Sequence, residues 1–248
     1  MLQLREMMGR ALGTLWGPAA RAGSVLRHAR VLHPEGIHLR AEVTPIQTDP
    51  PFLGLAERLE GPALVRLSSA MWRGGREWPD ILGAAVRFRG TGPLTEEAAP
   101  GDQDVLFATL RTPWTLGLAP LTTDVHDWLQ NDYYAVSPFA VRGLGRAKLR
   151  LTSTGWRDGV QGSRVERLEA ALRAGTAIFT FEVFPLDSGM PHTWTPVADI
   201  ALRGEVTLDP ALLRFNPFRD GRGITPRGFI HSLRLPTYQQ SQEGRVRH

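Results

Sequence analysis

A tyrosine near the C-terminus has neighbours that could make it a metal ligand. Arg234 precedes Tyr238 by four positions, and Arg245 follows it. If the segment is helical, Arg234 and Tyr238 share one face, and a guanidinium beside a phenol oxygen favours the phenolate. A phenolate is an anionic ligand suited to ferric haem. The alternative, which this stretch alone favours, is an ordinary terminal helix with solvated arginines; Pro236 would kink such a helix.

The composition narrows the class of protein. The chain has 248 residues, 42% of them apolar, which is enough for a substantial core. Abundant glycine (26) and proline (19) favour a loop-rich β protein over a helical bundle. The absence of cysteine excludes disulfides, iron–sulfur clusters, thiolate-ligated haem and Cys-type zinc sites. It also fits a reducing compartment, so we expect a cytoplasmic location.

The charge pattern gives no sign of a nucleic-acid partner. The net charge of +4 is small and scattered along the chain. Lys148 is the only lysine, and a preference for arginine suits fixed contacts to carboxylates such as haem propionates.

Residues 1–28 are predicted to form a helical extension to a single domain that spans 29–248. The apolar positions Leu2, Met7, Leu12 and Leu15 suit an amphipathic helix that packs on the body or on a partner. Charged residues interrupt this stretch, so it does not resemble a secretory signal. No run approaches the ~20 apolar residues of a membrane span, and we do not expect membrane contact.

The rest of the chain alternates between apolar and polar residues in short runs. In the first run, Ile37, Leu39, Ala41 and Val43 face one way, which is typical of a half-buried strand. Helices are predicted over 52–59 and over 164–173, the latter with Ser163 as cap and Gly175 as stop. The pattern from 113 to 134 also looks helical, with Asp124 as an N-cap. Predicted strands span 36–44, 63–69, 82–89, 104–110, 147–152, 176–184 and 198–208.

These elements predict an α+β fold. Strands come in pairs that can be antiparallel neighbours, and helices are inserted between the pairs. The sum is an antiparallel sheet of about seven or eight strands, closed as a barrel, with flanking helices in one domain.

Several short stretches, in order along the chain, resemble those of haem catalases. RVLH at 30–33 is similar to the segment that carries the distal histidine, VRLS at 65–68 to an Arg-aromatic-Ser stretch, and GAAVRF at 83–88 to a barrel strand. The Arg234–Tyr238–Arg245 spacing is similar to the segment of the proximal haem ligand. Further likeness lies in WTP at 194–196 and GEVTL at 204–208. The chain is short for this family and looks like a minimal, barrel-only member.

The resemblance implies a haem b site with a role for each matched residue. Tyr238 would ligate the ferric iron, with Arg234 and Arg245 favouring its phenolate. His33 would be the distal acid and base that moves a proton between the two oxygens of a peroxide, and Ser68 would orient the His33 ring. Other arginines would pair with the propionates; these are Arg30 and Arg66.

Departures from the family pattern shift the expected activity. The family carries a distal asparagine, and Gln103 is the nearest match, with an amide on a longer side chain. This change disfavours disproportionation of peroxide more than it disfavours peroxidase turnover. We therefore expect a peroxidase, or a weak catalase, that acts on hydrogen peroxide or organic hydroperoxides with a small-molecule reductant, as a homodimer at most.

Two alternatives stay open. The barrel could be a haem-free binding protein, which Pro236 and the missing asparagine favour. It could also be a hydroperoxide isomerase of the allene oxide synthase type. That enzyme has a threonine before the distal histidine where this chain has Leu32, which disfavours the isomerase.

Overall fold

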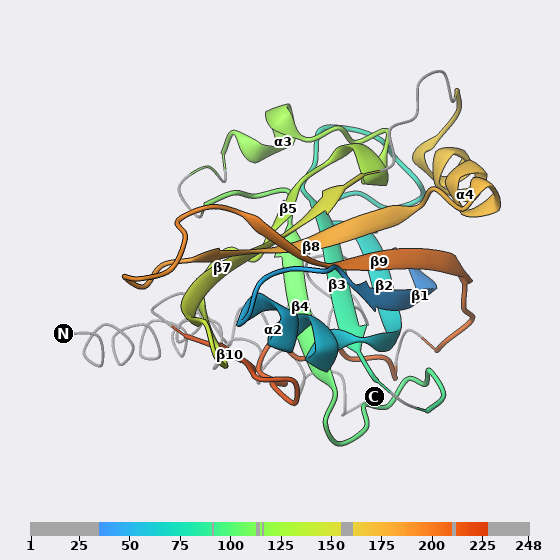
Figure 1. Ribbon diagram of the computed structural model, residues 1–248. Coiled ribbons are helices and arrows are strands. Elements are labelled where there is room, and N and C mark those ends of the chain that lie inside the picture. Colours follow the sequence, from blue (N-terminus) through green and yellow to red (C-terminus); the bar gives the residue numbers. More distant parts are fainter. Residues whose placement is uncertain are drawn as a thin grey trace, which may run out of the picture.

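A closed β-barrel dominates the computed structural model of the protein (Figure 1). The structure describes residues 35–90, 92–112, 115, 117–154, 161–209 and 212–227. The predicted N-terminal helix, and the C-terminal segment that carries Tyr238, lie outside these residues. Within the described part of the chain, no helix is long and apolar enough to cross a membrane.

Eight strands close into an antiparallel ring in the order β1-β2-β3-β4-β5-β7-β8-β9. The ring closes because β9 pairs with β1 on one side and with β8 on the other, while β8 also pairs with β7. Two short strands, β6 and β10, extend the sheet beyond β7. The predicted antiparallel barrel is therefore confirmed. The bounds are β1 Gly36–Pro45, β2 Gly61–Ser69, β3 Leu82–Phe88, β4 Gln103–Ala108, β5 Tyr133–Tyr134, β6 Phe139–Val141, β7 Gly145–Ser153, β8 Ile178–Pro185, β9 Thr195–Glu205 and β10 Ile224–Pro226.

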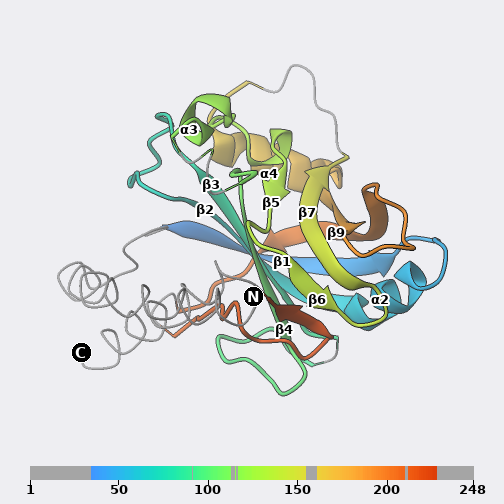
Figure 2. The same ribbon diagram turned by 90° about the vertical axis from the view of Figure 1, so that its left-hand side faces the viewer.

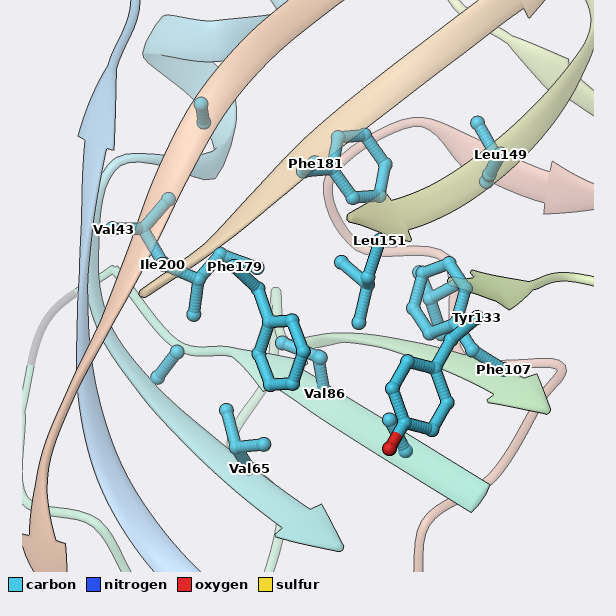
Figure 3. Packing of buried hydrophobic residues seen from close by; sticks show 14 of the residues in the cluster. Val43, Val65, Val86, Phe107, Tyr133, Leu149, Leu151, Phe179, Phe181 and Ile200 are labelled. Atoms are coloured by element: carbon cyan, nitrogen blue, oxygen red, sulfur yellow. The ribbon is translucent and has the colours of Figure 1, made fainter. Parts of the chain in front are cut away.

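The inside of the ring is filled with apolar side chains (Figure 3). Phe181 makes edge-on contacts with Phe88 and Phe107, at centroid distances of 5.8 and 6.2 Å. Tyr133 packs edge-on against Phe179, and its hydroxyl donates to the carbonyl oxygen of Trp128 at 2.7 Å. Burial raises the pKa of the Tyr133 phenol well above its usual value. An eight-stranded barrel can be filled by its own side chains, and here these side chains form the core of the protein.

Two predicted helices are present. Helix α2 (Phe52–Leu59) packs on β1 and β9 through Phe52, Leu55 and Leu59. Helix α4 (Arg164–Ala174) begins with a capping box in which Ser163 and Glu166 bond each other's backbone N–H, and it ends at Gly175 in the left-handed conformation. Helix α4 forms where the sequence predicts because its cap and stop residues are local signals, whereas α2 begins after Pro51 without a side-chain cap.

The predicted helix within 113–134 is wrong. The described residues there form helix α3 (Ala119–Thr122), the 3₁₀ turn η2 (Trp128–Gln130) and strand β5. Asn131 donates to the carbonyls of Asp124 and Asp127, and the N-cap of η2 is Asp127, whose carboxylate accepts from Leu129 N at 2.8 Å. Such side-chain bonds to the backbone compete with helical hydrogen bonds.

Strand β9 also ends earlier than the alternation predicts. A bulge in β9, opposite Arg40 and Ala41, shifts the register so that Leu202 faces the core whereas Val206 packs outside the barrel with Leu64 and Leu208. An inserted residue reverses the in–out pattern of a strand, which is why the run to Leu208 is not one continuous strand.

A buried ion pair holds the segment after β9 against the outside of the barrel. Arg87 and Asp104 are both fully buried, with Nε and Oδ1 3.0 Å apart. The Asp104 carboxylate also accepts from Asn216 N at 2.7 Å and from the Arg219 guanidinium. The Arg87 guanidinium stacks 5.1 Å from the Phe215 ring. Polar and apolar contacts together therefore cover this part of the outer surface.

Replacing Asp104 by Ala is expected to lower the free energy of unfolding by about 3–5 kcal/mol, because Arg87 is left as an uncompensated buried charge. The double replacement Arg87→Met with Asp104→Ala should cost less than the sum of the single replacements Arg87→Met and Asp104→Ala. Urea unfolding of the three variants measures this coupling, and strictly additive losses would show that the pair is not coupled.

Candidate functional site

Buried polar side chains gather on the outer face of β1 and β2. Strand register puts His38 opposite Arg66, and Ser68 lies two residues further along β2 on the same face. All three are buried, although the outer surface of a barrel is normally solvated. Most polar side chains are exposed to solvent, so a group of buried ones is informative. This part of the outer face is therefore the candidate site.

Arg66 lies against the start of the first strand. A Cβ atom added to Gly36 would meet the Arg66 guanidinium carbon at 2.9 Å and the carbonyl oxygen of Leu67 at 2.6 Å. Only glycine lets the guanidinium approach this closely to the backbone. The guanidinium of Arg66, the predicted propionate anchor, therefore packs against Gly36. Along the chain, Gly36 follows His33 by three positions.

The wall of the site is built from small residues. Ser68 pairs with Gly36 on one side and with Gly83 on the other, and Arg66 pairs with Ala85. The Ser68 hydroxyl donates to the carbonyl oxygen of Gly83 over a long 3.4 Å. Small side chains beside a guanidinium suit a planar macrocycle that carries carboxylates, and the buried His38 lies on the same face. In this respect the residue types fit a haem.

The loop between β2 and β3 borders this site. Glu35, just before β1, accepts a hydrogen bond from Gly74 N at 2.8 Å. The contact joins the chain that enters β1 to the tip of this loop. The rim of the site is therefore shaped by residues 71–80 as well as by the strands.

Gln103, the predicted distal amide donor, lies on the other face of the sheet. It shares the inward register of Val105 and Phe107, and it is fully buried. Its amide nitrogen donates to the carbonyls of Arg219 (2.7 Å) and Ile224 (3.0 Å), and its oxygen accepts from Ile224 N at 3.1 Å. These contacts are typical of a structural bridge to β10, so Gln103 offers no donor to the face that carries Arg66.

The alternation of apolar residues in β4 indicates that the Gln103 side chain points into the barrel. Since Val105 and Phe107 point inward, the even-numbered Asp102 and Asp104 point outward, and Gln103 cannot. Asp102 is buried and pairs with Arg89 at 3.1 Å. His38, on the polar side of the 36–44 alternation, lies opposite Arg66 and also belongs to the site.

The remaining predicted site residues lie outside the described part of the chain: Arg30, His33, Arg234, Tyr238 and Arg245. The structure therefore brings Arg66 and Ser68 together and leaves the roles of the other five as predictions. Among the described residues, no group of three or more His, Asp or Glu side chains could hold a metal ion.

Gly36→Ala is expected to destabilise the protein by about 1–3 kcal/mol, because the new methyl group overlaps backbone and displaces Arg66. Gly54→Ala is the matched control. There the added Cβ meets only Arg58 Nη1 at an ordinary 3.7 Å, and alanine should stabilise helix α2 by up to about 1 kcal/mol. Thermal unfolding distinguishes the two, and equal effects would contradict the close packing at Gly36.

Gln103→Leu should lower the free energy of unfolding by about 3 kcal/mol, because it leaves buried backbone groups of the 219–224 turn without partners. Gln130→Leu, at an exposed position, is the control and should be close to neutral. Chemical denaturation measures both; a stable Gln103→Leu variant would argue against a structural bridge.

Comparison with known proteins supports the fold. No protein-family model and no curated protein matches this sequence. The structure is similar to the crystal structure of a fungal catalase, with 11% sequence identity and a TM-score of 0.57. The match covers 88% of this chain and 59% of the catalase chain, so this chain spans less than two thirds of that protein's length. At this identity the likeness concerns the arrangement of strands and not the chemistry. The chain therefore has a catalase-like β-barrel fold.

Proposed function

We propose that this protein is a haem-dependent peroxidase whose cofactor lies on the outer face of β1–β3. The observation that carries the proposal is the meeting of Arg66 and Ser68 on one buried face of a catalase-like barrel. Both residues belong to stretches that resemble haem-site segments, and Gly36, Gly83, Ala85 and His38 lie beside them. A guanidinium next to small residues suits a haem with propionates.

Each matched residue has one task in this proposal. Arg66 and Arg30 pair with propionates, while Tyr238 ligates the iron, with Arg234 and Arg245 stabilising its ionised oxygen. When bound, the haem supplies a ferric iron that polarises the peroxide.

The distal residues handle the proton. His33 accepts a proton from one peroxide oxygen and returns it to the other. Ser68 bonds the second ring nitrogen of His33 and so fixes which nitrogen carries hydrogen.

Peroxidase turnover is favoured over disproportionation because Gln103 faces the interior. Disproportionation requires a second peroxide to be oriented as the reductant, which the family achieves with a distal amide. The Gln103 amide is bonded to the backbone around β10. The substrates that we propose are hydrogen peroxide or an organic hydroperoxide, together with a small-molecule reductant.

Expression with a haem supply should yield a protein with a Soret band. Tyr238→Phe is expected to abolish the band or change it, because it removes the ligand oxygen. Tyr134→Phe, on the half-exposed outer side of β5, is the control and should keep the wild-type spectrum. A colourless protein, or a Soret band that Tyr238→Phe leaves unchanged, would contradict the proposal and favour a haem-free binding protein.

His33→Ala should lower peroxidase turnover by about 10²–10⁴-fold while the Soret band persists, because the proton transfer loses its catalyst. Assays with and without a reductant, followed by product analysis, separate a peroxidase from a hydroperoxide isomerase. Consumption of hydroperoxide that needs no reductant would contradict the peroxidase.

A further inference from the structure

Exposed large apolar side chains gather at one end of the barrel. Of the six that the described residues expose, five belong to the connections β2–β3, β4–β5 and β7–β8. In an antiparallel ring these three connections lie at the same end, and Figures 1 and 2 both show α3 and the β2–β3 loop beside each other there. Leu121 is 75% exposed and Trp78 is 52% exposed. We call this end the apical face, and its members are Met71, Trp78, Leu118, Leu121 and Val165.

One carboxylate ties the three connections together. Glu77, next to Trp78, accepts from the backbone N–H of Arg164 at 2.7 Å, and its other oxygen lies 2.7 Å from His126 Nδ1. Arg164 precedes Val165, and His126 follows the segment that carries Leu121. The apical side chains are therefore held in a fixed arrangement by the fold.

The β2–β3 loop itself is tightly built. The buried Asp80 carboxylate accepts from the N–H groups of Met71 and Ile81 at 3.2 and 2.7 Å. Trp72 donates its ring N–H to the Pro79 carbonyl at 3.0 Å and packs edge-on against Trp78 at 5.0 Å. A loop with this much internal bonding presents Trp78 to solvent at little further entropic cost on binding.

The exposed charge on this loop is positive. Asp80 is buried and Glu77 is engaged within the fold, whereas Arg73 and Arg76 are exposed. Arg76 lies 5.1 Å from the Trp78 ring centroid. Near Val165, the exposed Glu166 carboxylate is negative and accepts hydrogen bonds from Ser163 N and Oγ. Indole rings with arginines beside them suit the boundary between lipid and water, and guanidiniums are attracted to anionic headgroups.

Contrary to the expectation from the sequence, we infer that the apical face binds the surface of an anionic lipid bilayer. Its apolar side chains stand at the tips of three connections with polar residues between them, an arrangement that headgroups can surround. The proposal does not depend on a bound haem. It does place the bilayer beside the candidate site, because the same loop contacts Glu35 through Gly74.

Vesicle flotation of the full chain tests the inference. We expect binding to vesicles of phosphatidylcholine with phosphatidylglycerol, weaker binding without phosphatidylglycerol, and a loss of binding as salt rises. The double change Trp78→Ala with Leu121→Ser should weaken binding at least about tenfold. Arg73→Gln with Arg76→Gln should weaken binding to the anionic vesicles about thirtyfold.

Matched controls lie at the opposite end of the molecule. Leu212 is 60% exposed, and its segment contacts the β3–β4 loop through Asp209 N and Glu96. Leu212→Ser should leave vesicle binding unchanged, as should Arg146→Gln with Lys148→Gln at the start of β7. Unchanged melting temperatures confirm that the variants fold. Absence of wild-type binding, or binding that the apical changes leave intact, overturns the inference. The inference is also overturned if the wild-type protein binds no vesicles but self-associates, and if the apical changes abolish this self-association. The apical face would then bind a second copy of the chain.

Discussion

Closure of the sheet into a ring is the constraint from which the rest of this molecule follows. Once β9 pairs with both β1 and β8, every strand must turn one face to a common interior. An interior of eight strands can be filled by side chains alone, and Phe179, Phe181 and Tyr133 pack there. The inside is therefore the hydrophobic core, and the candidate site lies on the outer face.

The outer face of β1–β4 has two halves, which differ in how their buried polar side chains are paired. Toward the β3–β4 loop, Arg87 and Asp104 neutralise each other, and Phe215 lies over them, so this half is closed by the protein's own chain. Toward the β2–β3 loop the face carries small residues with Arg66 and Ser68. One half holds the segment after β9, and the other half is the candidate site. The two halves differ in the size and charge of their side chains.

The fold and the site support the proposed function in different ways. A barrel shared with a fungal catalase at 11% identity describes how the strands are arranged, and one fold serves many functions. What points to haem is the residue pattern: a guanidinium packed on Gly36, with a serine two positions along the strand. The contact between Glu35 and Gly74 adds that the rim of this wall and the apical face share one loop. In the two proposals, the haem site and the lipid-binding face would thus share one loop.

The sequence by itself determined the features that depend on neighbours along the chain. Alternation predicted the strands, and the caps at Ser163 and Gly175 predicted α4, because these signals act within a few residues. It also placed Arg66 and Ser68 on one face, since residues two apart on a strand point the same way. Only the tertiary structure decided the rest. The bulge in β9, the turns of 117–134 and the inward position of Gln103 depend on contacts between distant segments. Those contacts exist only once the ring has closed, so no local pattern could specify them.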